Sequence, residues 1–113
     1  MAENRILQVN ELIKRELSKL ILKEIEFPKD TLVTITRVQT SSNLIQTKVY
    51  VSVIPENQTP RILQILNQQI FNLQQIINKR LKMRPIPKIK FVEEKETGKA
   101  ERVEKLLEKI KNN

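Results

Sequence analysis

The feature that most constrains the fold is a long helical segment that has an alternating run of residues on each side of it. In 44–54, valines alternate with polar residues, which is the pattern of a half-buried strand. An apolar stripe at helical spacing then occupies 59–84, and PKIKFV at 87–92 alternates again. A strand, a helical crossover and a further strand normally give two parallel strands. We therefore expect the strand at 87–92 to lie parallel to the strand at 44–54.

The N-terminal part of the chain predicts a helix and the first strand. Apolar residues recur at helical spacing over 3–26, and Phe27-Pro28 ends this helix because the residue before a proline is pushed out of the α region. TLVTITRV at 31–38 is rich in β-branched residues and predicts a strand that forms a hairpin with 44–54. Either face of this first strand could be the buried one.

The crossover and the C-terminal part complete the predicted element order α-β-β-α-α-β-α. The helical stripe at 59–84 is long for one helix, so we expect a bend, or two helices that meet near 69–74. A polar loop at 93–98 precedes a last helix at 99–111. Helices on one face of a mixed three-stranded sheet give an α+β fold, a two-layer α/β sandwich. The length suits one domain, 1–113.

The chain contains no cysteine and no histidine. This excludes disulfides, thiolate and imidazole metal ligands, cysteine nucleophiles and histidine acid–base chemistry. Glu93, Glu94 and Glu96 lie close together, but lysines flank them and we expect all three to be solvated. We therefore expect no enzymatic activity, no cofactor, no metal and no small-molecule substrate.

No segment of the sequence resembles a membrane anchor. No apolar run approaches the roughly 18–20 residues that span a bilayer, and Met1 leads into polar residues rather than a signal-peptide core. The absence of cysteine fits a reducing compartment. We expect a soluble, cytoplasmic protein without a membrane partner.

The net charge of +8 is concentrated in one short part of the chain. Residues 1–30 contain six basic and six acidic side chains, and residues 93–113 contain six of each again. Residues 31–77 contribute only +2, so the remaining +6 lies in residues 78–92, which we call the basic segment. A local excess of positive charge indicates a polyanionic partner. Its cations are Lys79, Arg80, Lys82, Arg84, Lys88 and Lys90.

Each cation of the basic segment also has a purely structural explanation. Cations in the last turn of a helix interact favourably with the helix dipole by about 0.3–1 kcal/mol each, and we place Arg80, Lys82 and Arg84 in such a turn. Lysines on an exposed edge strand discourage aggregation. The segment nevertheless holds six cations and no acidic residue before Glu93, so we expect the cluster as a whole to contact phosphates.

The alternation in the last predicted strand assigns its side chains to two faces. Ile89 and Phe91 should point into the core, and Lys88 and Lys90 should then point to the uncovered face of the sheet. There they would lie near Lys48 of the neighbouring strand.

The aromatic and glycine content restricts how a nucleic acid could be bound. The chain has three phenylalanines, one tyrosine and no tryptophan, so an aromatic stacking platform of the RRM or OB type is not expected. Its single glycine, Gly98, excludes a GxxG loop, a P-loop and a dinucleotide-binding fingerprint. Recognition of shape and backbone fits this composition better.

Several strings, in this order and spacing, resemble the ribosome-binding factor A family. They are VQTSSNLIQTKVYV at 38–51, KMRPIPKIKF at 82–91, an acidic residue at Glu94, and RVEKLL at 102–107. The similarity covers nearly the whole chain, from about Arg5 to Leu107. The resemblance implies a type II KH-like fold from which the GxxG loop is absent, and it implies a non-enzymatic RNA-binding domain.

The resemblance also implies a function and a partner. Members of this family bind the immature small (30S) ribosomal subunit, contact its 16S rRNA, promote rRNA processing and maturation, and are associated with growth in the cold. The basic segment would supply the RNA contacts, with Arg5, Lys48, Ser41 and Asn43 as weaker candidates. We expect the protein to act as a monomer.

The sequence departs from the family pattern at several positions. Gln8 and Ser42 replace arginines, and Asn43 replaces an aspartate. Gln74 stands where an arginine is usual, shortly after the predicted bend. A different class of function is also open: a protein-interaction module whose basic segment meets an acidic protein partner.

Overall fold

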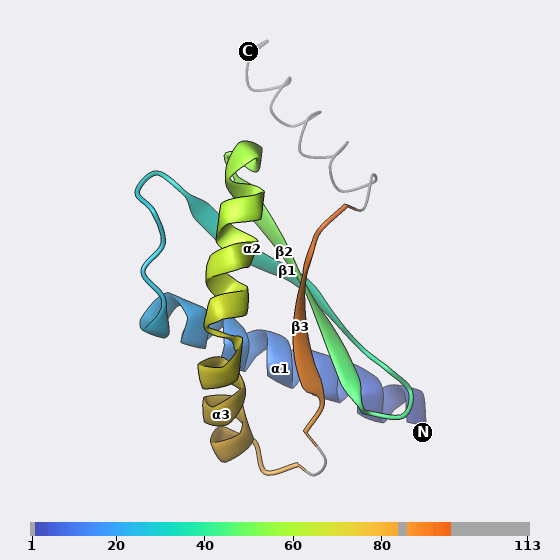
Figure 1. Ribbon diagram of the computed structural model, residues 1–113. Coiled ribbons are helices and arrows are strands. Elements are labelled where there is room, and N and C mark those ends of the chain that lie inside the picture. Colours follow the sequence, from blue (N-terminus) through green and yellow to red (C-terminus); the bar gives the residue numbers. More distant parts are fainter. Residues whose placement is uncertain (1, 84–85, 96–113) are drawn as a thin grey trace.

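Three strands form one mixed sheet, and the helices pack against one of its faces (Figure 1). The computed structural model describes residues 2–83 and 86–95. The predicted C-terminal helix at 99–111 lies outside the described residues. Within the described ranges, no helix is long and apolar enough to cross a membrane. In chain order the elements are α1 (Ala2–Glu24), β1 (Leu32–Thr40), β2 (Gln46–Ile54), the 3-10 turn η1 (Glu56–Gln58), α2 (Thr59–Gln68), α3 (Ile70–Arg80) and β3 (Lys88–Glu93).

The sheet has the predicted topology. Its strand order is β1-β2-β3, with β2 in the middle. β1 and β2 pair in antiparallel fashion as a hairpin, and β2 and β3 pair in parallel, with Val49 opposite Phe91. The parallel pair is connected through α2 and α3, so the prediction from the crossover is confirmed.

The core lies between the helices and one face of the sheet. Val49, Val51 and Phe91 are buried on that face, whereas the residues that alternate with them along β2 and β3 are exposed or half-buried. All three helices contribute to the same hydrophobic cluster. The described helical residues that are most completely enclosed are Ile13, Leu17, Leu20, Ile21, Ile62, Leu66, Leu73 and Ile77.

An irregularity in β1 determines which of its faces is buried. The register with β2 shifts between Ile35 and Arg37, so one extra residue, Thr36, is inserted. Ile35 is buried before this bulge and Val38 after it, which breaks the strict alternation. The sequence alone could not assign the buried face of β1, because no single alternation of buried and exposed residues holds along the whole strand.

The long helical segment is interrupted, as the sequence predicted. Gln69, with φ −95° and ψ 0°, separates α2 from α3. The predicted end of the helix at Arg84 is wrong, because α3 ends at Arg80 and Leu81 already has an extended backbone. Leu81 is buried where the chain turns toward β3. Lys82 therefore lies beyond the helix and does not interact with its dipole as a last-turn residue.

Candidate nucleic-acid interface

The uncovered face of the sheet carries three neighbouring lysines. Lys48 on β2 is directly opposite Lys90 on β3, and Lys88 lies two residues along the same strand opposite Gln46. All three are exposed. Their inward-facing neighbours Ile89 and Phe91 are buried. The predicted approach of Lys88 and Lys90 to Lys48 is confirmed, and we call these three residues the lysine row.

The other cations of the basic segment lie at the end of α3 and beyond it. Lys79 and Arg80 occupy the last turn of α3. Arg80 forms an ion pair with Glu16 of α1, with Nη1 3.7 Å from Oε2, although 43% of its side-chain surface is exposed. Lys82 is exposed, and Arg84 lies outside the described residues. The basic segment thus places cations both at the end of α3 in the helical layer and on the uncovered face of the sheet.

The weaker candidates Ser41 and Asn43 close the hairpin between β1 and β2. The Ser41 hydroxyl donates a hydrogen bond to Asn43 Oδ1 (2.6 Å) and accepts one from the backbone N–H of Gln46 (3.1 Å). Asn43 Oδ1 also accepts from the backbone N–H of Ile45 (3.1 Å). These contacts give both residues a structural role in the turn. Arg5 is exposed in the first part of α1.

An arginine on the uncovered face was missed by sequence reasoning. The Arg37 guanidinium lies over the Tyr50 ring, with Cζ 3.8 Å from the ring centroid. Its Nε and Nη2 donate to the two carboxylate oxygens of Glu94, at 3.0 and 3.4 Å. The Thr36 hydroxyl also donates to Glu94 Oε2 (2.7 Å). The expectation that Glu94 is solvated is wrong, because only 6% of its side-chain surface is exposed.

Gln74 on α3 joins the helical layer to the start of β3. Its Oε1 accepts a hydrogen bond from the backbone N–H of Ile89 (2.9 Å), and its Nε2 donates to the carbonyl oxygen of Pro87 (3.2 Å). The same nitrogen donates to Asn78 Oδ1 (3.0 Å). The side-chain amide thereby pairs with β3 as a neighbouring strand would, and it fixes where the lysine row begins.

We predict that Gln74→Ala lowers the free energy of unfolding by about 1–3 kcal/mol, because it leaves the N–H of Ile89 in β3 and the carbonyl of Pro87 just before β3 without this partner. Chemical denaturation of the two proteins measures this difference. Gln75→Ala is the matched control, since Gln75 is exposed on the same helix and should change stability by less than about 0.5 kcal/mol. Equal effects of the two substitutions would show that the Gln74 contacts do not stabilise β3.

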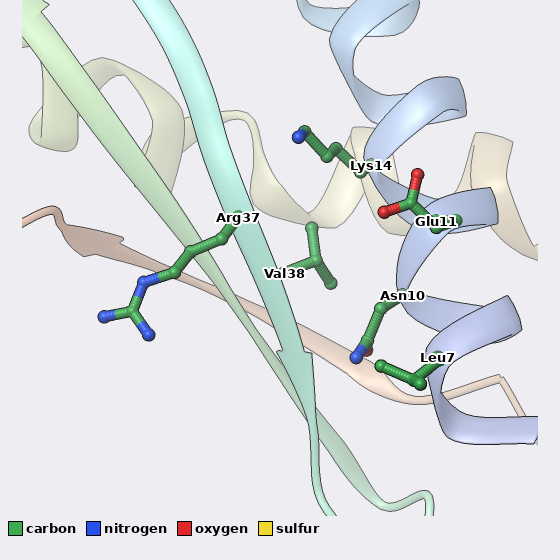
Figure 2. Close-up of a pocket in the computed structure, with 6 residues that line it drawn as sticks. All are labelled: Leu7, Asn10, Glu11, Lys14, Arg37 and Val38. Carbon is green, nitrogen blue, oxygen red and sulfur yellow. The ribbon is translucent and has the colours of Figure 1, made fainter. Parts of the chain in front are cut away.

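A shallow cavity lies between α1 and β1, on the covered side of the sheet (Figure 2). Its volume is about 360 Å³. The Arg37 guanidinium points away from it, toward the opposite face of the sheet (Figure 2). Among the described residues, no group of three or more acidic side chains could hold a metal ion. The residues that line the cavity are Leu7, Asn10, Glu11, Lys14, Arg37 and Val38.

Comparison with known proteins confirms the resemblance over nearly the whole chain. The ribosome-binding factor A family matches residues 5–107. The chain belongs to this family. Ribosome-binding factor A from Nitrosococcus oceani is 34% identical over 107 residues, which cover 94% of this chain and 84% of that protein.

Solved structures of ribosome-binding factor A share the fold. The crystal structure of the Thermus thermophilus protein matches with a TM-score of 0.67 and 25% identity, over 78% of this chain and 93% of that one. A homology model of the Thermus thermophilus protein, fitted into the cryo-EM map of a 30S complex with this factor, matches with a TM-score of 0.61 and 25% identity, over 74% and 88%. The predicted KH-like fold is thus confirmed.

Proposed function

We propose that this ribosome-binding factor A family member binds the immature small ribosomal subunit in the cytoplasm. It contacts the 16S rRNA and stabilises a maturing conformation of it, which promotes rRNA processing without covalent chemistry. The lysine row is the observation that carries this proposal, because three adjacent cations on one rigid sheet face are arranged to meet a phosphate backbone. The related protein fitted into a map of a 30S complex supports the choice of partner.

Contacts to phosphate provide affinity for RNA and fix the position of the protein on it, and they need no catalytic group. None of the three lysines is paired with an acidic residue across β2 and β3, because Lys48 is opposite Lys90 and Lys88 is opposite Gln46. Further candidates for phosphate contact are Lys79 and Arg80 at the end of α3, Lys82 beyond it, and Arg84, which lies outside the described residues. Arg80 must exchange its ion pair with Glu16 for a phosphate, which lowers what it can contribute.

The test is crosslinking of the protein to immature small subunits, followed by identification of the crosslinked nucleotides. We expect crosslinks to 16S rRNA from positions at and beside the lysine row. Nuclease treatment of the native complex separates this proposal from a protein-interaction module. Loss of the complex after RNA digestion supports RNA contact, whereas a complex that survives and crosslinks only to ribosomal proteins would contradict it.

A further inference from the structure

We propose that Arg37 and Tyr50 form a stacking site for one base of a single-stranded RNA segment that lies along the uncovered face of the sheet. This inference rests on the proposed function and specifies which form of RNA that face accepts. Stacking requires a flat surface held in one orientation, beside cations that position the backbone. The described residues of the uncovered face supply both.

The orientation of the Arg37 guanidinium is fixed from two directions. The Tyr50 ring supports one plane of the group, with Cζ 3.8 Å from the centroid. Two nitrogens on its edge are held by the nearly buried Glu94 carboxylate. The ring is held in turn, because its hydroxyl donates to Gln39 Oε1 (3.1 Å). A base that stacks on this guanidinium therefore meets a surface whose conformational entropy is already low.

Part of Arg37 remains accessible to a ligand despite these contacts. Its side chain keeps 38% of its surface exposed, whereas that of Glu94 keeps 6%. Guanidinium planes stack on bases in RNA recognition, as aromatic rings do. An arginine plane supported by the only tyrosine of the chain thus replaces the aromatic platform that the composition excludes.

Two members of the lysine row lie in the row of the sheet next to Arg37. Arg37 is opposite Tyr50, and Tyr50 is opposite Val92, which forms one row across all three strands. The next row on the same face contains Lys48 and Lys90. Two residues along a strand correspond to about 6.6 Å. A nucleotide whose base stacks on Arg37 can therefore place its phosphate near these lysines.

This arrangement selects a single strand over a duplex. The bases of an RNA helix are stacked on one another, so their planes are not available to a side chain. An acidic protein would satisfy the lysine row, but it has no flat base to place on Arg37. The combination of a supported plane and adjacent cations therefore favours unpaired RNA as the ligand.

The full chain allows a direct test, because Tyr50 is its only tyrosine and it has no tryptophan. Intrinsic fluorescence thus reports on Tyr50 alone. Binding of a ten-nucleotide unpaired oligoribonucleotide, an abasic oligonucleotide of the same length and charge, and poly-glutamate is measured by anisotropy of labelled probes and by tyrosine emission. We expect the oligoribonucleotide to bind about 5- to 100-fold more tightly than the abasic strand and to quench Tyr50, with poly-glutamate the weakest.

Variants of Arg37 separate stacking from charge. Arg37→Lys keeps the positive charge but removes the planar guanidinium. It should therefore lose the preference for the oligoribonucleotide over the abasic strand, while the salt dependence of binding stays the same. Arg61→Lys is the matched control, because Arg61 is exposed on α2, and it should behave as wild type. Circular dichroism of Arg37→Lys checks that the fold is intact.

Three results would overturn the stacking site: equal binding of the abasic strand, equal binding of poly-glutamate, or an unchanged base preference in folded Arg37→Lys. Cosedimentation of wild-type protein with small subunits is measured in parallel. If the protein cosediments but shows no base preference, the stacking site is wrong and the proposed function stands. If it neither cosediments nor crosslinks to rRNA, the proposed function fails.

Discussion

Replacement of Lys48, Lys88 and Lys90 together by glutamine is expected to lower the affinity for small ribosomal subunits by on the order of 10²-fold near 0.15 M salt. Each phosphate contact releases condensed counterions, so the logarithm of affinity falls with the logarithm of salt concentration in proportion to the number of contacts. Three lost contacts should reduce that slope by about two to three. Cosedimentation or anisotropy over a series of salt concentrations measures both quantities.

A variant with the same change in charge provides the control. Lys19 and Lys23 are exposed on α1, and Lys29 is exposed in the loop that follows it, so none of the three belongs to the sheet. Their replacement by glutamine lowers the net charge equally but leaves the uncovered sheet face intact. Equal losses in the two triple variants would mean that only net charge matters, and the lysine row would not be the contact surface.

The parts of the fold that follow from repeated local patterns were predictable from the sequence. Alternation in β2 and β3 identified their buried faces, because the side chains of a strand point alternately to the two sides of the sheet. The parallel pairing followed from the helical connection between them. The interruption of the crossover was expected from its length, and it occurs at Gln69.

The bulge in β1 and the end of α3 could not be located in the same way. Thr36 and Arg37 are ordinary strand residues, and only pairing with β2 shows that one of them is extra. α3 ends at Arg80, although Leu81 continues the apolar spacing, because the chain becomes extended there on its way to β3. Such boundaries are set by the packing of distant elements and not by the local sequence.

In the candidate site, too, features that follow from local patterns were predictable, and features that depend on distant contacts were not. The lysine row follows from the parity of two strands and was predicted. The Arg37–Glu94 contact joins residues 57 positions apart and depends on the bulge, which brings Thr36 and Arg37 to one carboxylate. Gln74 was noted only as a departure from the family pattern, whereas the structure shows it bound to the backbone of β3.

Phe91→Ala is expected to destabilise the protein by about 3–5 kcal/mol, because it leaves a cavity in the core behind β3. Phe91 is 5% exposed and packs in the cluster that all three helices share. Domains of this size have a total stability of about 5–15 kcal/mol, so a loss of this size removes a large part of it. Chemical denaturation with a two-state analysis measures the change.

Lys90→Gln, at the preceding position of the same strand, is the matched control. Lys90 is exposed on the opposite face, so its replacement should change stability by less than about 0.5 kcal/mol while it weakens binding to small subunits. Phe91→Ala should lower stability but, at temperatures where it remains folded, leave binding to small subunits unchanged. If Lys90→Gln destabilised the protein as much as Phe91→Ala, the lysine would belong to the packing of β3. If the two effects separate, adjacent residues of one short strand divide stability and recognition between the two faces of the sheet.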